Sequence, residues 1–333
     1  MRTSTRKSSR TKTTEFSVIH VRCAGRHVRP ASLEPAFLLG AMRAGVSEVV
    51  ADPGLTEHLV SAVSRVAARQ LRAAAGRVFA FVGAKGGVGT TTLAVNVASA
   101  LGRSGTRVLL VDVHEGDGDA ATFLNAQPIR TLGDACQNVH RLDERFLRGI
   151  VTQAGGGLDL LAAPDATGAH VIDAVPFRAV MQRAAATYPC VIIDASPRHV
   201  PLLESVESLT RLFIVTNQEF VSLKRGRRLA DGLKSWCRDG RLSAVVNRFD
   251  DHGEIGERDV ERVLGIGVTH TVPDDYARVC AAVGRGRPVV CADRSELGDA
   301  LTALAARLSG TSSEAGYAAP PRPGFLQRLA RAG

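Results

Sequence analysis

The chain has 333 residues, of which 45% are hydrophobic. It is therefore long enough and apolar enough to fold around a hydrophobic core. Its net charge is +9 and its isoelectric point is near 9.7, which raises the question of an acidic partner such as nucleic acid. No apolar run approaches the ~18 residues that cross a bilayer, so we expect a soluble, cytoplasmic protein. The six cysteines include no C-x-x-C pair, which disfavours metal clusters and disulfides.

The basic excess is partly located at the start of the chain, where residues 1–15 carry five Lys or Arg side chains and no acid before Glu15. This segment has no apolar stretch of the kind that a secretory signal needs, so we interpret it as a disordered basic tail. A solubilising role and a contact with DNA or anionic lipid both stay open, and nucleic-acid binding is not the favoured interpretation.

Residues 16–72 predict a small module of their own. A β-like run covers 16–21, a helical pattern ends at 38–45, a strand covers 46–51 and a helix covers about 56–72. The segment LLGAMRAGVSEVVADPGLTEHLVSAV resembles the last strand and helix of a response-regulator receiver domain. The expected lysine after that strand is replaced by Ala51-Asp52-Pro53, and too little chain precedes it for a phosphoacceptor strand. We therefore interpret residues 16–72 as a degenerate, partial receiver-like docking module.

Residues 73–309 alternate between strand and helix patterns, which predicts one α/β domain with a mostly parallel, doubly wound sheet. The expected strands have a near-continuous Val/Ile/Leu character, which is typical of strands buried on both faces. They cover residues 78–82, 108–113, 158–162, 190–193, 212–216, 242–246 and 268–271. In such sheets, ligands bind beyond the carboxyl ends of the strands.

The segment GAKGGVGTTT follows the first of these strands and precedes a helical pattern at 93–98. A strand that enters a helix through a glycine-rich turn directs backbone N–H groups and the positive end of the helix dipole at one point, where a phosphate binds. Gly86, Gly87 and Gly89 permit left-handed backbone angles there. The candidate nucleotide-binding residues of this loop are Gly83, Ala84, Lys85, Gly86, Gly87, Val88, Gly89, Thr90, Thr91 and Thr92.

The loop differs from the usual pattern G-x-x-x-x-G-K-[ST] because Thr90 stands where lysine is expected. Thr91 still supplies the hydroxyl that binds Mg²⁺. A second lysine, Lys85, lies early in the loop, which marks the deviant Walker A subclass.

Three further strand ends carry polar residues. Asp112 and Asp194 each end an apolar run, so their carboxylates are candidates for holding Mg²⁺ or positioning the attacking water. Asn247 ends another, and its amide either reads the adenine edge or belongs to a plain turn.

The chain resembles the MinD/ParA superfamily of deviant Walker P-loop ATPases and, within it, the CpaE/TadZ group that assembles Flp-type (tad) pili. The resemblance covers about residues 36–309. It rests on GAKGGVGTTTLAVNVA, VLLVDVHEGDGDAATFL, GLDLLAAPDA, VIIDASPRHV, VVNRFDDHGEI and VTHTVPDDYARVCAAVGRGRPV.

The resemblance implies a MinD-like (SIMIBI) fold and a homodimer that sandwiches two ATP molecules, with Lys85 reaching the partner's phosphates. It implies ATP and Mg²⁺ as cofactors, with Thr91, Asp112 and Asp194 at the metal. It also implies that Arg248, Pro273 and Asp275 contact the nucleotide. His114 stands where the superfamily usually has the Asp that orients the hydrolytic water, so we predict a weak ATPase in which Asp117 or Asp119 could compensate.

Residues 310–333 are a Gly/Ser/Pro linker followed by a short basic segment with Phe325, Leu326 and Leu329. It is either a frayed tail or a weak interfacial anchor at the inner membrane.

We therefore expect an ATP-dependent dimerising protein that places a Flp/tad pilus or type II/IV secretion machine, at the inner membrane or a cell pole, through contacts with the proteins of that machine. The alternatives are a ParA-like DNA-partitioning or MinD-like division-site ATPase and a non-hydrolysing scaffold with a vestigial ATP site.

Overall fold

The computed structural model describes residues 76–310, apart from residues 117, 165–171 and 238–239, together with the backbone of three strands nearer the start. The chain divides into two compact units, Met1–Ala74 and Ala75–Gly333. No helix among the described residues has the length and apolar character needed to cross a membrane.

The first unit contains a small antiparallel sheet in the order β2-β1-β3. Its strands are β1 (Phe16–Ile19), β2 (His27–Val28) and β3 (Glu48–Ala51). The expected strands at 16–21 and 46–51 overlap β1 and β3. The helix expected at 56–72, both tails and most of the receiver-like segment lie outside the described residues, so those interpretations stay predictions.

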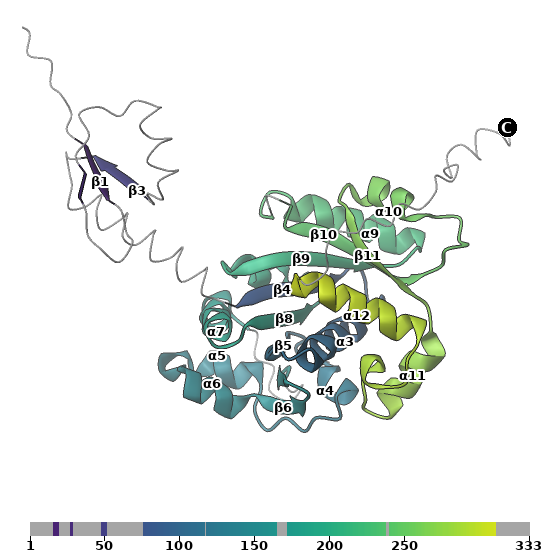
Figure 1. Cartoon of the computed structure of the whole chain (residues 1–333), viewed down its shortest axis with the longest axis horizontal. Helices are drawn as coiled ribbons and strands as arrows, with labels where there is room; N and C mark the ends of the chain where they lie inside the picture. Colours follow the sequence, from purple (N-terminus) through teal and green to yellow (C-terminus); the bar gives the residue numbers. More distant parts are fainter. Residues whose placement is uncertain are drawn as a thin grey trace, which may run out of the picture. The chain divides into compact units, whose positions relative to one another are not determined.

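The second unit is built on an eight-stranded sheet in the order β11-β10-β9-β4-β8-β5-β7-β6 (Figure 1). All neighbouring pairs are parallel except β6 with β7, which is antiparallel. The strands are β4 (Arg77–Gly83), β5 (Val108–Asp112), β6 (Thr152–Gly155), β7 (Leu158–Leu161), β8 (Cys190–Ala195), β9 (Leu209–Thr216), β10 (Leu242–Phe249) and β11 (Val268–Pro273).

The seven strands expected from the sequence are confirmed, whereas β6 is not among them. Its residues Thr152–Gly155 alternate between half-buried and exposed and contain no run of large apolar side chains. An antiparallel edge strand can face solvent on one side, so its sequence lacks the continuous run of apolar residues by which strands buried on both faces are recognised.

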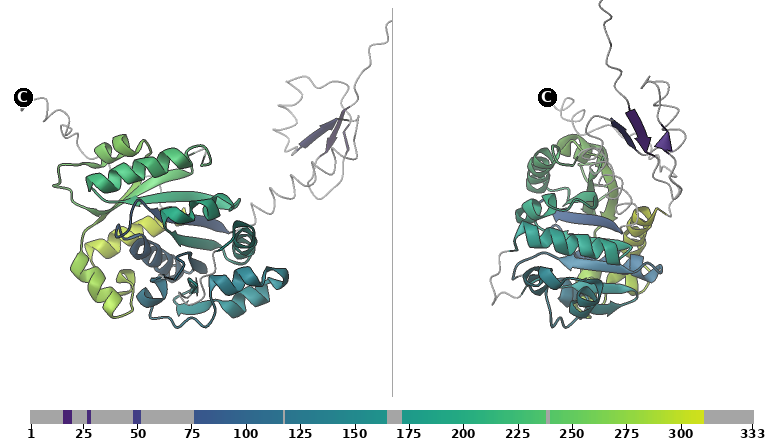
Figure 2. Two further views of the ribbon diagram at one scale, coloured as in Figure 1. Left: turned by 180° about the vertical axis from the view of Figure 1, so that it is seen from behind. Right: turned by 90° about the vertical axis from the view of Figure 1, so that its left-hand side faces the viewer.

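Helices cover both faces of this sheet (Figures 1 and 2). On one face α3 and α12 pack together over the sheet, and on the other α7, α8 and α9 complete a second apolar layer. The helices and helical turns are α3 (Thr90–Arg103), α4 (Ala120–Phe123), α5 (Leu132–Gln137), η1 (Val139–Arg141), α6 (Glu144–Ile150), α7 (Ala174–Thr187), η2 (Pro197–His199), α8 (Val200–Glu204), α9 (Phe220–Leu233), α10 (Glu257–Leu264), α11 (Tyr276–Gly284), η3 (Val289–Cys291) and α12 (Glu296–Ser309).

Alternation along β4 shows why the sheet needs both layers. Val78, Ala80 and Val82 point into one apolar cluster, while Phe79 and Phe81 point into the other. Because successive side chains of a strand face opposite sides, a strand whose residues 78–82 are all apolar needs a helical layer on each face. Each fully buried Val or Phe contributes about 1.5–3 kcal/mol through transfer from water.

The register of the central strands brings the predicted motifs to one edge. Asp112 of β5 lies opposite Asp194 of β8, and Phe81 of β4, two residues before the glycine-rich loop, lies opposite the same Asp194. The loop and both carboxylates therefore meet beyond the carboxyl ends of three adjacent parallel strands.

Candidate functional site

The glycine-rich loop joins β4 directly to α3. Gly87 and Gly89 have φ values of 78° and 87°, as the sequence predicts, whereas the same expectation for Gly86 is wrong, since its φ lies outside the left-handed region. Gly89 is the N-cap of α3, and no side chain caps the helix. The N–H groups of the first turn are therefore left for a ligand, and an anion suits that position.

Close contacts fix the shape of this loop. A methyl group on Gly83 would lie 2.5 Å from the Thr90 hydroxyl, so the Thr90 side chain turns back over the end of β4. A methyl group on Gly89 would clash with the Asn247 amide nitrogen. That nitrogen donates a hydrogen bond of 2.8 Å to the Val88 carbonyl. Asn247 thus braces the loop, a role that the sequence did not reveal, and its contact with adenine stays a prediction.

Lys85 is paired within its own chain. Its Nζ lies 3.0 Å from Glu219 Oε2, and Glu219 Oε1 accepts a 2.8 Å hydrogen bond from the Asn217 amide. The bond from Lys85 and, next, that from Asn217 lower the pKa of Glu219. Glu219 was not among the residues predicted from the sequence, although its position three residues after β9 puts it at the same edge of the sheet as the loop.

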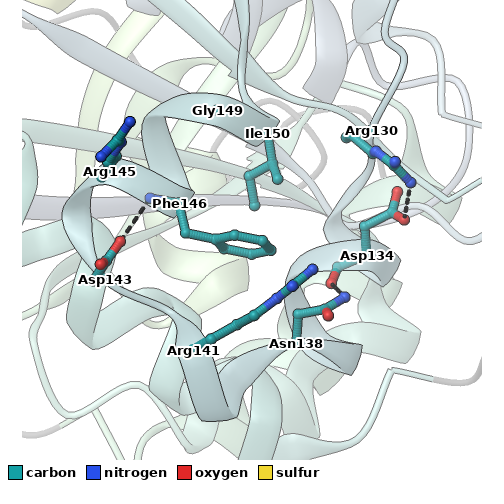
Figure 3. A pocket seen from close by; sticks show the side chains of 9 residues that line it. All are labelled: Arg130, Asp134, Asn138, Arg141, Asp143, Arg145, Phe146, Gly149 and Ile150. Carbon is teal, nitrogen blue, oxygen red and sulfur yellow. Dashed lines mark hydrogen bonds and ion pairs between the residues drawn. The ribbon is translucent and has the colours of Figure 1, made fainter.

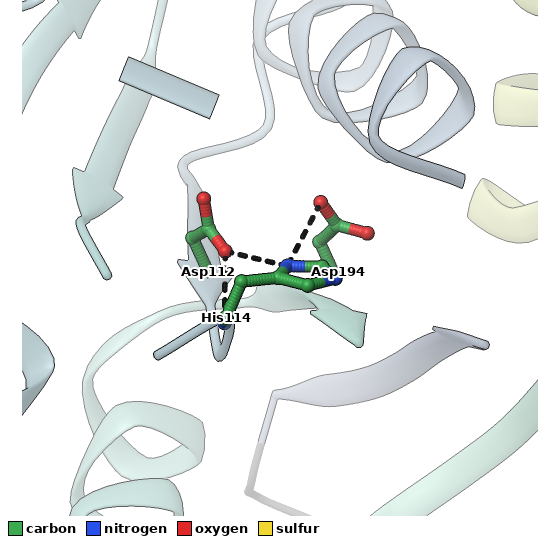
Figure 4. A group of neighbouring side chains, drawn as sticks. All are labelled: Asp112, His114 and Asp194. Carbon is green, nitrogen blue, oxygen red and sulfur yellow. Dashed lines mark hydrogen bonds and ion pairs between the residues drawn. The ribbon is translucent and has the colours of Figure 1, made fainter. Parts of the chain in front are cut away.

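Asp112, His114 and Asp194 form a compact group beside the loop (Figure 4). His114 Nδ1 lies 2.8 Å from Asp112 Oδ1 and 3.8 Å from Asp194 Oδ2. Asp112 also accepts hydrogen bonds from the backbone N–H groups of His114 and Ala120, at 3.1 and 3.2 Å. Both oxygens of the Asp112 carboxylate therefore accept hydrogen bonds within the protein.

Asp194 has the opposite character. It is completely buried, and neither of its oxygens has a hydrogen-bond partner of standard geometry among the described residues. Burial is the main reason that the pKa of Asp194 is raised, and the neighbouring Asp112 raises it further, while His114 and the Thr91 hydroxyl act in the other direction. An orphaned buried carboxylate next to the Thr91 hydroxyl fits the ligand set of a divalent cation.

His199 lies next to His114. It was not among the site residues predicted from the sequence. The two rings meet edge to face, with centroids 5.5 Å apart and an interplanar angle of 86°. His199 is almost fully buried, and its Nδ1 accepts a 3.2 Å hydrogen bond from the Ser196 N–H. Burial, followed by the His114 and Arg198 charges, lowers the pKa of His199 to about 4, so the ring is neutral.

The remaining loop residues have backbone roles. The Ala84 N–H donates to the Val215 carbonyl at 2.7 Å, and the Thr92 carbonyl accepts a 2.8 Å bond from the Asn96 amide. Asp119 is the exposed N-cap residue of α4, and Asp117 lies outside the described residues.

Three candidate nucleotide contacts come from later in the chain. Arg248 follows Asn247 with a φ of 53°, and its guanidinium lies 5.9 Å from the centre of the Tyr276 ring. Pro273 ends β11. Asp275 is the N-cap of α11, where its Oδ1 accepts a 3.0 Å bond from the Arg278 N–H. Helix capping accounts for that carboxylate, and its nucleotide contact stays a prediction.

A surface cavity of about 520 Å³ lies elsewhere, between α5, η1 and α6 (Figure 3). The guanidinium of Arg141 lies 4.9 Å from the centre of the Phe146 ring there, and Arg130 pairs with Asp134 at 3.3 Å. None of the predicted nucleotide residues lines this cavity, so we assign the candidate site to the edge of the sheet and not to this hollow.

The family described as CobQ/CobB/MinD/ParA nucleotide binding domain matches residues 79–289, well over half of the chain. The chain belongs to this nucleotide-binding family. The match includes the glycine-rich loop, Asp112, His114, Asp194 and Asn247.

Known members of the MinD/ParA family resemble the chain along most of their length. The septum site-determining protein MinD of Thermotoga maritima is 24% identical over 245 residues, which cover 71% of this chain and 89% of that protein. A ParA family ATPase from Chlorobium tepidum superposes with a TM-score of 0.65 at 29% identity, covering 69% and 99% of the two chains. MinD of Pyrococcus horikoshii complexed with Mg-ADP gives a TM-score of 0.60 at 22% identity, covering 72% and 99%.

Proposed function

We propose that the chain is an ATP-binding switch of the MinD/ParA type, loaded with ATP and Mg²⁺, that dimerises to place another cellular structure. The observation that carries the proposal is the completely buried and orphaned Asp194 carboxylate beside the open N-terminus of α3. A fully buried carboxylate that accepts no hydrogen bond of standard geometry is unfavourable in the empty protein, and a bound cation compensates its charge.

The phosphates would bind at the loop. The uncapped first turn of α3 offers its N–H groups, and the left-handed Gly87 and Gly89 allow the backbone to approach without a Cβ in the way. Thr91 and Asp194 would hold Mg²⁺, with Asp112 as the second carboxylate. When bound, the ion supplies positive charge against the β- and γ-phosphates. Arg248, Pro273 and Asp275 complete the nucleotide contacts that we propose.

Hydrolysis by this site would be slow. Thr90 brings no positive charge to the phosphates, and its side chain turns back toward Gly83. His114 brings an imidazole to the position of the water-orienting Asp, and that imidazole is engaged with Asp112 at 2.8 Å. The loss of one preorganised electrostatic group typically costs about 10²–10³ in rate. A phosphate-release assay should therefore show turnover far below the ~10 s⁻¹ median of enzymes, and turnover near that median would contradict the proposal.

Dimerisation would use Lys85. In the single chain this lysine is occupied by Glu219, and apolar side chains next to that pair are exposed, namely Phe220 at 75% and Val221 at 53%. We propose that Lys85 leaves Glu219 for the phosphates of a second copy. Sedimentation with a non-hydrolysable ATP analogue tests this: Lys85→Ala should lose self-association while it retains nucleotide binding. A variant that dimerises like the parent would show that Lys85 acts within its own subunit.

For the cellular role, a positioning function of the MinD or ParA kind has the better support, because the named relatives are septum-site and ParA proteins. The finer candidate is the organisation of a Flp-type pilus or secretion machine, as in the CpaE/TadZ group, and it is favoured by Thr90 in the loop. Fluorescence localisation of the tagged full chain separates the two. Foci that vanish when neighbouring secretion genes are deleted support the finer candidate, and foci that follow the nucleoid or septum support the first.

The binding step itself is tested by calorimetric titration of ATP with and without Mg²⁺. The parent should bind ATP more tightly with Mg²⁺, and Asp194→Asn should remove that gain. Asp159→Asn is the matched control, since Asp159 is also a buried strand aspartate but lies outside the site. A parent protein that binds no ATP, or an Asp194→Asn variant with an undiminished Mg²⁺ effect, would overturn the assignment.

A further inference from the structure

The cluster of Asp112, His114 and Asp194 has a donor set that a magnesium site does not need. One ligand atom from each side chain lies within 4.8 Å of the other two, and the imidazole nitrogen sits between the two carboxylates (Figure 4). Mg²⁺ prefers an all-oxygen shell that keeps several waters, whereas imidazole suits Zn²⁺, Co²⁺ and Ni²⁺. The histidine thus changes which ion the cluster prefers.

We propose that Asp112, His114 and Asp194 bind a divalent transition-metal ion in the nucleotide-free chain, and that Zn²⁺ is the ion they bind most tightly. The proposal goes beyond nucleotide binding because all three ligands come from the protein and none from a phosphate. It is tested independently of the proposed ATP site.

The distances support such a site. Ligands about 2.0–2.2 Å from a tetrahedral zinc ion lie about 3.3–3.6 Å from one another. His114 Nδ1 lies 2.8 Å from Asp112 Oδ1 and 3.8 Å from Asp194 Oδ2, so small side-chain shifts would complete the geometry. The ion would take the place of the proton between Nδ1 and Oδ1; that proton would leave to solvent, and the neutral ring that binds the ion would carry its own proton on Nε2.

The charges of the cluster also support it. Asp112 and Asp194 are 1% and 0% exposed, so two neighbouring carboxylates are both buried away from solvent. Asp194 has no hydrogen-bond partner of standard geometry among the described residues, and its Oδ2 lies 3.8 Å from the imidazole Nδ1. A dication compensates both carboxylates at once. His114 keeps 16% of its side-chain surface exposed, which gives an ion access from solvent.

Neighbouring groups already orient two of the ligands. The Ala120 N–H holds Asp112 Oδ2 at 3.2 Å, and a methyl group on Gly118 would lie 2.6 Å from the same oxygen. The His199 ring packs edge to face against His114, and the Ser196 N–H fixes His199 in turn. Such supporting contacts are typical of metal ligands, whose outer neighbours hold the ring and the carboxylate in place.

The test uses the full, untagged, nucleotide-free chain. Zn²⁺ is titrated by calorimetry and Co²⁺ by its visible absorption, each in a large excess of Mg²⁺. The parent should bind one ion per chain despite the Mg²⁺. His114→Asn keeps an amide donor toward Asp112 and removes the imidazole, so it should weaken Zn²⁺ and Co²⁺ binding by about 10- to 100-fold or more. His140→Asn, at an exposed histidine of η1, should bind like the parent.

Two results would overturn the proposal. One is equal Zn²⁺ affinity of the parent and His114→Asn, and the other is displacement of Co²⁺ by an equal concentration of Mg²⁺. If circular dichroism shows that His114→Asn is unfolded, Asp112→Asn tests the same site from another ligand, with the same expected loss. Titration of ATP with Mg²⁺ on the parent reports on the nucleotide proposal alone, so the two proposals fail independently.

Discussion

Two buried aspartates of the same sheet, Asp159 and Asp194, occupy opposite environments. Asp159 is the second residue of β7, and its Oδ2 accepts hydrogen bonds of 2.9 Å from Arg107 and 2.8 Å from the Tyr188 hydroxyl. Asp194 is the fifth residue of β8 and has no such partner among the described residues. A satisfied buried carboxylate stabilises the fold, whereas an orphaned one is retained at an energetic cost and marks a ligand site.

The two partners of Asp159 also contact each other. The Arg107 guanidinium also lies 5.1 Å from the centre of the Tyr188 ring, and Tyr188 is only 1% exposed. Burial, followed by the hydrogen bond to Asp159, raises the pKa of Tyr188 well above its ordinary value, so the phenol stays protonated and donates. Asp159 needs no further ligand.

The largest effect that we expect follows from removing the satisfied carboxylate. Asp159→Ala should lower the free energy of unfolding by about 2–4 kcal/mol, chiefly because the buried Tyr188 hydroxyl loses its acceptor, while the exposed Arg107 adds little. Urea unfolding measures the change. Asp159→Asn, which keeps an acceptor oxygen, should lose less. An unchanged Asp159→Ala midpoint would show that this cluster does not stabilise the fold.

The orphaned carboxylate should behave in the opposite way. Asp194→Asn should raise the free energy of unfolding by about 1–3 kcal/mol at about pH 8, because an uncompensated buried charge is removed. The pKa of Asp194 is raised in the fold above its ordinary 3.8, so the unfolded chain loses the proton first and stability falls as pH rises from about 4. The gain should therefore vanish near pH 4. A destabilised variant at both pH values would remove the contrast with Asp159.

His199 extends the comparison to a buried imidazole, since its Nε2 has no hydrogen-bond partner among the described residues. Its pKa is about 4 in the fold against an ordinary 6.5, so the unfolded chain takes up a proton first as pH falls. Stability from this group is full above about pH 6.5 and is lost as pH falls toward 4. Between about pH 7 and 5 the loss should be about 1–2 kcal/mol.

His199→Asn keeps an acceptor for the Ser196 N–H and has no proton to take up. The variant should therefore lose less stability than the parent when chemical unfolding is repeated at the two pH values. Equal losses in both proteins would show that His199 titrates normally in the fold.

The smallest effect concerns the pair between Lys85 and Glu219 at the rim of the site. Because the Glu219 side chain is 56% exposed, water solvates its charge, and Glu219→Gln should leave the melting temperature of the nucleotide-free chain unchanged. A thermal melt at low and high salt measures this. A clear fall in melting temperature would mean that the pair stabilises the fold, unlike the other groups at the site.

Local sequence determined the phosphate loop and the strands. The segment 83–92 contains both the turn and the start of the helix. Its backbone is left-handed at Gly87 and Gly89, where glycine is favoured because it has no Cβ. Most of the seven strands were readable because they are near-continuous apolar runs buried on both faces, whereas β11 is half-buried and carries Thr and His. The family match covers residues 79–289 of this chain, which contain the glycine-rich loop and nearly all of those strands.

Tertiary structure alone decided which polar groups meet. Asp112 and Asp194 are neighbours only because β5 and β8 pair in one register, and a shift by one residue would turn one of them to the other face. The Asn247 bond to Val88 and the Lys85 pair with Glu219 likewise join residues more than 130 positions apart in the chain. Hydrophobic pattern identifies strands but not their order or register, so sequence could nominate these side chains, and only the folded sheet could bring them together.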